Sequence, residues 1–265
     1  THSIINQLQN EGELNLSDPL SKYLDIYPEE TGSKITIQML VEMKAGLGDY
    51  LNNPAFNNNR SKFRTVNDFL ELIKNEPLLF EPGTSQRYSN SGYAVLGGVI
   101  EKVTGKSYTE NLKERFLEPL GMTNTHYKLI GEPLENTARG TVITFSGDKV
   151  NSKFEEQPSP AGGMFSTPRD LLKFDAELRK TGIMGLGIRA GGTQVWNAIF
   201  AQLKEGYTLI ITSNFGMASE EVLSRFQMIF KGEPYHAPGI TMEMQFYRIL
   251  TDSGPAGLKK DLKQI

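Results

Sequence analysis

Apolar residues recur at helical spacing along much of the chain. The clearest stretch follows Asn90 and ends at Gly105, and its apolar positions lie three or four residues apart: Tyr93, Leu96, Val99, Ile100 and Val103. This spacing places apolar side chains on one face of a helix, and a glycine after the last of them is a common helix end. The pattern therefore predicts a helix between Asn90 and Gly105.

Further helices are predicted where an apolar stretch follows a capping residue. Thr65, Ser107 and Thr167 each stand before such a stretch, and serine and threonine side chains satisfy the free N–H groups of a helix start. The helix after Thr167 is expected to end at Gly182 and to bury Leu171, Leu172, Phe174 and Leu178. A helical face near the start of the chain runs to Gly12 and contains Ile4, Ile5 and Leu8.

The second half of the chain contains strand patterns. Residues 198–201 and 207–212 are apolar runs of strand length on either side of Glu205 and Gly206, which predicts an antiparallel pair. A helix ending at Gly232 and a further helix within residues 241–265 are predicted after them. The asparagine-rich stretch 52–60 and the polar stretch 131–158 lack helical periodicity, so the first is expected to be a mobile loop and the second a hairpin or loop.

Composition limits the classes of protein that this chain can represent. Its 265 residues have room for one large domain or two small lobes, and 38% hydrophobic with 22% charged residues suits a globular protein. The net charge of -3 argues against nucleic-acid binding. No run approaches the eighteen or so apolar residues of a membrane span. We expect a small-molecule or peptide substrate, and the oligomeric state is not indicated.

Metal and cofactor chemistry is not indicated either. The chain has no cysteine, and its three histidines (His2, His126 and His236) are scattered, which makes a zinc site unfavourable. Residues 185–190 fit G-x-G-x-x-A, but they follow a predicted helix and precede predicted strands, whereas a dinucleotide fingerprint follows a strand and opens a helix. We expect no cofactor.

A tyrosine and an asparagine stand where catalytic side chains are often displayed. Tyr88 and Asn90 follow a Pro82-Gly83 turn signal and lead directly into the predicted helix. A bare Y-x-N is common by chance, and a tyrosine before a helix usually packs in the core. The neighbouring residues therefore have to decide between the two interpretations.

Those neighbours resemble a known family. Residues 80–122 are similar to the serine β-lactamase and penicillin-binding protein superfamily, in its branch of class C β-lactamases, DD-peptidases and related esterases. The similar segments are Glu81-Pro82-Gly83, Tyr88-Ser89-Asn90, Gly92-Tyr93, Val103-Thr104-Gly105-Lys106 and Glu118-Pro119-Leu120-Gly121-Met122. A second similar block covers residues 159–171. The resemblance implies three motifs, which are S-x-x-K with the nucleophile, Y-x-N, and a strand motif K-T-G or H-x-G.

The resemblance assigns roles to residues of the second and third motifs. Tyr88 and Asn90 fill Y-x-N and would be catalytic. Arg189 occupies the lysine or histidine position of the strand motif, with Gly191, Gly192 and Thr193 after it, and these four residues would bind substrate or form the oxyanion hole. The Gly192 N–H would be the second oxyanion donor. The alternative for Arg189 is a solvated residue beside a turn, and the family usually has more chain between the Thr167 helix and this strand.

The first motif is not found at its expected place. Residues 7–24 resemble the family segment that follows the nucleophile helix, and counting back places the serine about five or six positions before Thr1 and the lysine just before Thr1. We therefore expect the S-x-x-K serine and lysine upstream of this chain. The family also commonly has His and Ser where this chain has Met43 and Ala45.

The expected fold is the β-lactamase/transpeptidase-like one, of α/β class in the α+β sense, with an antiparallel sheet flanked by helices and a mainly helical lobe. We expect one domain over residues 1–240, with a helical lobe at about 14–150, a sheet lobe at about 159–240 and the N-terminal strands absent, and a C-terminal helical extension over 241–265.

The expected function is serine acyl transfer on a β-lactam, a D-Ala peptide or an ester, in a periplasmic or secreted protein. The alternative is a non-catalytic module that binds a peptide or ligand in the same cleft.

Overall fold

The computed structural model describes residues 1–74, 76–133, 135–144, 148–182, 187–193, 195–203, 206–216 and 218–234. They fall into two compact units. The helical unit comprises the described residues of 1–134 and 156–185, and the sheet unit comprises those of 135–155 and 186–265. Residues 135–155 thus belong with the sheet, and the helix after Thr167 with the other helices, whereas the sequence suggested lobes at about 14–150 and 159–240. The helix predicted within residues 241–265 lies outside the described residues.

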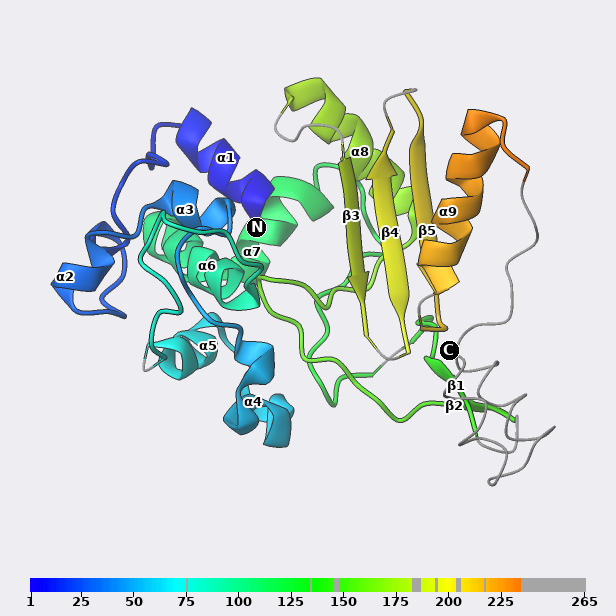
Figure 1. The fold of residues 1–265 in the computed structure, drawn as a ribbon, viewed down its shortest axis with the longest axis horizontal. Helices are drawn as coiled ribbons and strands as arrows, with labels where there is room; N and C mark the ends of the chain where they lie inside the picture. The colour runs from blue at the N-terminus through cyan, green and yellow to red at the C-terminus, as the bar shows by residue number, and fades with distance from the viewer. Residues whose placement is uncertain are drawn as a thin grey trace. The chain divides into compact units, whose positions relative to one another are not determined.

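The helical unit contains two longer helices, α6 (Asn90–Thr104) and α8 (Pro168–Thr181), and several shorter ones (Figure 1). The shorter α-helices are α1 (His2–Asn10), α2 (Glu29–Gly32), α3 (Ile37–Val41), α4 (Pro54–Asn58), α5 (Val66–Ile73) and α7 (Tyr108–Leu112). Shorter turns of 3₁₀ helix are η1 (Leu20–Lys22), η2 (Tyr50–Asn52) and η3 (Arg60–Lys62), and η4 (Lys113–Leu117) is a π-helical turn.

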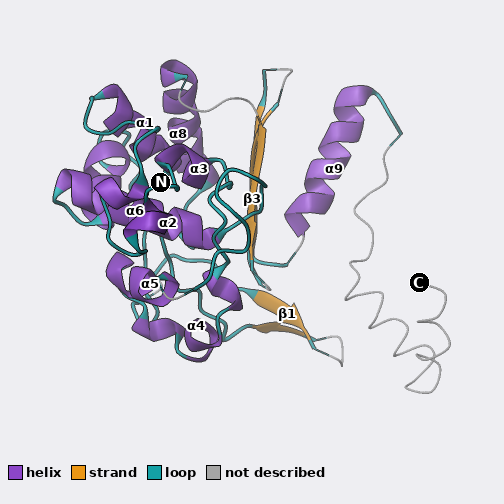
Figure 2. Cartoon of the chain, turned by 60° about the vertical axis from the view of Figure 1, so that its left-hand side comes forward, coloured by secondary structure: helices purple, strands orange, loops and turns teal. Residues whose placement is uncertain are grey.

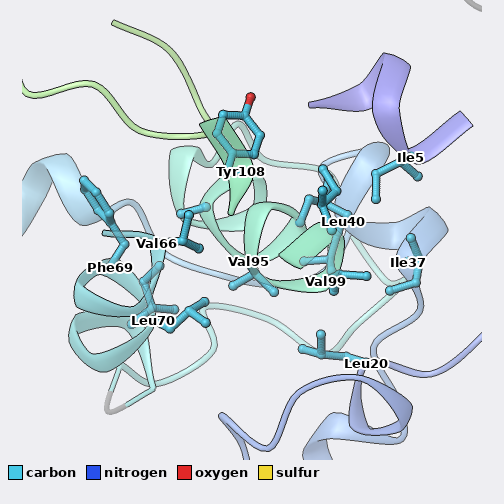
Figure 3. Close-up of a cluster of buried hydrophobic side chains, with 14 of the residues drawn as sticks. Ile5, Leu20, Ile37, Leu40, Val66, Phe69, Leu70, Val95, Val99 and Tyr108 are labelled. Carbon is cyan, nitrogen blue, oxygen red and sulfur yellow. The ribbon is translucent and has the colours of Figure 1, made fainter. Parts of the chain in front are cut away.

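Helix α6 is the centre of the core of this unit. Figure 3 shows side chains of three other helices gathered around Val95 and Val99 of α6, namely Ile5 of α1, Ile37 and Leu40 of α3, and Val66, Phe69 and Leu70 of α5. A Cβ added at Gly97 of α6 would lie 2.3 Å from Cγ of Pro160. Glycine at this position therefore lets the loop before α8 pack directly against the helix.

The predicted helix ends are confirmed. Thr65 and Ser107 form capping boxes, and the Thr167 side chain accepts a hydrogen bond from the backbone N–H of Asp170. Gly105 and Gly182 end α6 and α8 in the left-handed conformation, with φ of 69° and 64°.

One predicted core position of α8 is wrong. Leu172 is 50% exposed, because it lies one position away from the stripe on which Leu178 is buried and Phe174 packs against the core. The buried side chain beside that stripe is Asp175, which pairs with Arg179 at 2.9 Å.

The asparagine-rich stretch is ordered into helical turns and is not the mobile loop expected from its composition. Asn53 caps α4 by accepting a hydrogen bond from the backbone N–H of Ala55, and its amide donates to Glu76 at 2.8 Å. Phe56 of α4 is fully buried. The segment is therefore held by the buried Phe56 side chain and by the Asn53 cap.

The sheet unit contains two antiparallel arrangements (Figure 2). The predicted 131–158 hairpin consists of β1 (Thr141–Ile143) and β2 (Lys149–Asn151). The larger sheet has the order β3-β4-β5, formed by β3 (Gly187–Gly192), β4 (Asn197–Gln202) and β5 (Thr208–Ser213). The predicted antiparallel pair is thus confirmed as β4 and β5.

Helix α9 (Ala218–Lys231) covers one face of this sheet. Its Leu223 packs against Ile199 and Ala201 of β4, which form the small core of the unit. The combination of antiparallel strands and packed helices confirms the expected α/β class. None of the described helices is long and apolar enough to cross a membrane.

Candidate active site

The two residues of the second motif lie side by side at the start of α6. Tyr88 is in the loop before the helix and keeps 68% of its surface exposed, and Asn90 is the first helical residue. The Tyr88 hydroxyl donates a hydrogen bond of 3.1 Å to Oδ1 of Asn90. The fold therefore presents both predicted catalytic side chains together, outside the core.

Ser89 fixes the place where α6 begins. Its buried hydroxyl accepts from the backbone N–H of Gly92 at 3.1 Å, as a helix N-cap does, and donates to the carbonyl oxygen of Gly48 at 2.6 Å. One side chain thus joins the helix start to the segment before η2. This explains why Ser89, between the two motif residues, faces inward while Tyr88 faces outward.

Asp49 is a third member of the site, which the sequence analysis did not identify. Its Oδ2 accepts from both the backbone N–H and the side-chain amide of Asn90, at 3.2 and 2.8 Å. Its Oδ1 accepts from the backbone N–H of Leu51 at 3.0 Å and so caps η2. An aspartate before a helical turn could have been read as a cap, but its contact with Asn90 spans 41 residues and leaves no local signal.

Buried contacts of Tyr50 support Asp49 and the start of α6. The backbone N–H of Tyr50 donates to the hydroxyl of Ser91 in α6 at 2.9 Å, and the Tyr50 and Ser159 hydroxyls lie 2.8 Å apart. The Tyr50 ring meets Phe56 and Phe69 edge-on, with centroids 4.9 and 5.0 Å away. Tyr50 therefore joins the chain next to Asp49 to α6, to the loop before α8, and to α4 and α5.

The environment keeps Tyr88 protonated at neutral pH. Partial burial is the larger cause and the negative charge of Asp49 the smaller one, and together they raise the pKa of Tyr88 above its ordinary value. A neutral phenol can donate its proton to Asn90, as the geometry requires. It is also a poor base, unless a cation near its hydroxyl offsets the negative charge of Asp49 and lowers the pKa of Tyr88.

The residues of the predicted third motif lie in the sheet unit. Arg189, Gly191 and Gly192 belong to β3, and Thr193 directly follows that strand. Arg189 is opposite Phe200 in the register, and its guanidinium carbon is 5.9 Å from the Phe200 ring centroid. Nη1 of Arg189 also donates to the carbonyl oxygen of Gly187 at 3.5 Å.

Thr193 shapes the turn between β3 and β4. Its hydroxyl accepts from the backbone N–H groups of Val195 and Trp196, at 3.2 and 3.1 Å, and its own N–H donates to the Trp196 carbonyl at 2.7 Å. The residues just before β1 contact this turn, because the Trp196 indole donates to the Ala138 carbonyl at 3.1 Å. A Cβ at Gly140 would lie 2.5 Å from Val195.

Metal-binding geometry is absent from the described part of the chain, where no three histidine or acidic side chains lie close enough together to hold an ion. The helical unit presents hydroxyl, amide and carboxylate groups at the Y-x-N motif, and β3 of the sheet unit carries the guanidinium of Arg189. Such groups suit proton transfer and hydrogen bonding to a polar substrate.

Comparison with known proteins gives a consistent result. A family model described as Beta-lactamase matches residues 3–220. Protein flp of Staphylococcus aureus strain N315 is 30% identical over 170 residues, which cover 62% of this chain and 34% of the relative. The chain thus spans about a third of the length of that curated relative.

Solved structures share the fold. A penicillin-binding protein from Bacillus halodurans is similar with a TM-score of 0.73 and 20% identity, over 86% of this chain and 82% of that one. A D-stereospecific amidohydrolase from a Streptomyces species is similar with a TM-score of 0.70 and 22% identity, over 88% of this chain and 84% of that one. At these identities the similarity shows the fold alone.

Proposed function

The chain belongs to the beta-lactamase family, and we propose that it contributes the tyrosine and asparagine of a serine hydrolase that works through an acyl-enzyme. One observation carries this proposal. The exposed Tyr88 hydroxyl is hydrogen-bonded to Asn90 at 3.1 Å, and Asp49 and the α6 cap hold Asn90 in place. A purely structural Y-x-N would not need an exposed tyrosine hydroxyl bonded to an asparagine that Asp49 holds through two further hydrogen bonds.

In the proposed reaction the serine and lysine of S-x-x-K precede Thr1. The serine oxygen attacks the substrate carbonyl, and Tyr88 takes part in moving the serine proton to the leaving group. The bond between the carbonyl carbon and the leaving group then breaks, and an ester to serine remains. Water then attacks this ester, passes its proton back through the same groups and releases the acid. Tyr88 is the proton-transfer residue in both halves.

The raised pKa of Tyr88 makes a cation necessary for this role. With the ordinary tyrosine pKa only about 0.1% is phenolate at pH 7, and the environment of this chain lowers that fraction further. An ammonium group beside the hydroxyl would favour the phenolate or relay the proton. The lysine of S-x-x-K is the group that we propose for this task.

The sheet unit would contribute substrate binding. We propose that Arg189 binds a substrate carboxylate, because its planar guanidinium matches a carboxylate in two-point contact. Gly192 would donate its N–H to the oxyanion, an interaction that lowers the activation barrier by about 2.7–4 kcal/mol. Gly191 and Thr193 would shape this strand end. The substrates in this proposal are amides or esters with a carboxylate, such as a β-lactam or a peptide ending in a D-amino acid, which implies a protein outside the cytoplasm.

The deciding experiment uses the full-length protein with a fluorescent penicillin and an activated ester. We expect a stoichiometric adduct by intact mass, ester turnover, and a loss of about 10²–10⁴-fold in kcat for Tyr88→Phe. Tyr207→Phe is the matched control, because Tyr207 is also exposed and lies in the sheet unit. Saturable but non-covalent binding, with no turnover, would instead identify a binding module.

A further inference from the structure

The side-chain amide of Asn90 has two chemically different ends. Its oxygen only accepts hydrogen bonds and its nitrogen only donates them, so its orientation decides what the site can offer to a substrate. Among the described residues, two side chains bond to this amide: the hydroxyl of Tyr88 on one end and the carboxylate of Asp49 on the other.

Only one of these two contacts can set the orientation. A hydroxyl can donate or accept, so Tyr88 would tolerate either end of the amide. An ionised carboxylate accepts only, so the end that faces Asp49 has to be the amide nitrogen. The 2.8 Å bond from Nδ2 of Asn90 to Asp49 therefore forces Oδ1 toward the Tyr88 hydroxyl.

Asp49 itself is fixed by the backbone. Its Oδ1 caps η2 by accepting from the Leu51 N–H, and its Oδ2, which bonds the Asn90 side chain, also accepts from the Asn90 backbone N–H. Rotation of the carboxylate would break both bonds. The charge of Asp49 also acts on the neighbouring tyrosines Tyr50 and Tyr88, and it opposes ionisation of both.

We propose that Asp49 is a positioning residue of the acyl-transfer site, which holds the Asn90 amide in one orientation through the Nδ2–carboxylate bond. With this orientation one Nδ2 hydrogen binds Asp49 and the other remains for a substrate carbonyl. One lone pair of Oδ1 meets Tyr88 and the other remains for an ammonium group. The inference rests on the proposed function.

The test compares Asp49→Asn with Asp68→Asn in the full-length protein. Asparagine is as good a cap as aspartate, so Asp49→Asn keeps the η2 contact while allowing the Asn90 amide to turn over. Asp68 is a matched control in the same unit, because its carboxylate accepts from the backbone N–H groups of Arg64 and Thr65 and does not contact Asn90. We expect Asp49→Asn to lower kcat on an activated ester by about 10²-fold, the typical effect of a misplaced catalytic group, and Asp68→Asn to leave kcat within about twofold of wild type.

A swap variant separates positioning from simple stabilisation. Asp49→Asn with Asn90→Asp restores a carboxylate–amide pair with the ends exchanged, so it should recover the melting temperature. It should not recover kcat, because the substrate-facing position then has a carboxylate in place of an N–H donor. Recovery of kcat in the swap, or wild-type kcat in Asp49→Asn, would overturn the proposal.

A readout without catalysis keeps the inference separate from the proposed function. In the ¹⁵N-labelled 265-residue chain, the Asn90 amide proton bonded to Asp49 should exchange with solvent more slowly than its geminal partner. Asp49→Asn should abolish this difference and Asp68→Asn should preserve it. A preserved difference in Asp49→Asn refutes the inference, whereas an inactive full-length wild type refutes the proposed function.

Discussion

The hydroxyl groups of Tyr50 and Ser159 lie 2.8 Å apart although 109 residues separate them in sequence. Tyr50 directly follows Asp49, and Ser159 belongs to the loop whose Pro160 packs on Gly97 of α6. The contact therefore joins the support of the Y-x-N site to the segment that leads into α8. Both side chains are buried, so neither hydroxyl can exchange its partner for solvent without cost.

Removing one of these hydroxyls should destabilise the helical unit. Ser159→Ala leaves the buried Tyr50 hydroxyl without this partner, and Tyr50→Phe leaves the Ser159 hydroxyl bonded to the Ala161 N–H alone. Each single loss should cost about 1–3 kcal/mol in the free energy of unfolding. The double variant should lose less than the sum of the two single losses, because the second substitution removes the orphaned group. Urea unfolding of the three variants measures the coupling, and strictly additive losses would show that the two hydroxyls do not interact.

Gly97 should not tolerate a side chain. Alanine would place a Cβ 2.3 Å from Cγ of Pro160, so α6 and the loop would have to separate, at a cost of about 1–3 kcal/mol. Gly162→Ala is a matched control from the same loop, because its added Cβ would meet no atom within 4 Å. Thermal unfolding should rank Gly97→Ala well below wild type and Gly162→Ala close to it. Equal melting temperatures for the two variants would contradict the close packing.

Local features of the fold could be predicted from the sequence, and contacts between distant segments could not. Helix α6 was predictable because its start and its C-terminal glycine are local signals over fifteen residues. Leu172 was misassigned because amphipathic spacing gives the period of a stripe but not its edges. Asp49 and Ser159 were invisible as site supports, because each acts across more than forty residues.

The three motifs illustrate the same limit for function. Tyr88 and Asn90 are two residues apart, so their proximity followed from the sequence, and the structure adds the hydrogen bond between them. Thr193 was assigned to substrate binding or the oxyanion hole, and the structure adds that its hydroxyl accepts from two N–H groups of the turn, which leaves its proton for a further bond. A motif gives the position of a residue in the chain, whereas the hydrogen bonds of a side chain depend on neighbours that only the fold brings together.

Stability should fall at alkaline pH because of buried tyrosines. Burial, and secondarily the charge of Glu76, raises the pKa of Tyr27 to about 12. Between about pH 10, where an unfolded tyrosine ionises, and pH 12, the unfolded state loses its proton first and is favoured. Tyr27→Phe should therefore reduce the fall in melting temperature between about pH 10 and 12. Near pH 8 the change of melting temperature with pH should be the same in the variant and in wild type. An unchanged alkaline slope in Tyr27→Phe would show that Tyr27 does not contribute.

Arg189→Ala should discriminate between substrates in the full-length enzyme. Loss of a charge-assisted bond should weaken transition-state binding of carboxylate-bearing substrates by about 1.5–3 kcal/mol, and neutral esters should be affected much less. Arg139→Ala is a control of equal charge in the sheet unit. Equal losses of kcat/KM for both substrate types in Arg189→Ala would place Arg189 outside the binding site.

The 265-residue chain by itself should not react with penicillins. Ser146 and Lys149 have the S-x-x-K spacing, but Lys149 is the exposed first residue of β2, whereas the family motif opens a helix. Ser89 is buried and both caps α6 and donates to Gly48, so it is not available for attack. Incubation with a fluorescent penicillin and intact mass measurement should show no adduct. Ser146→Ala is the control for the chance match, since an adduct that disappears in this variant would identify Ser146 as the nucleophile. An adduct that persists in Ser146→Ala would point to another serine of the chain, and either result would refute the upstream position proposed for the first motif.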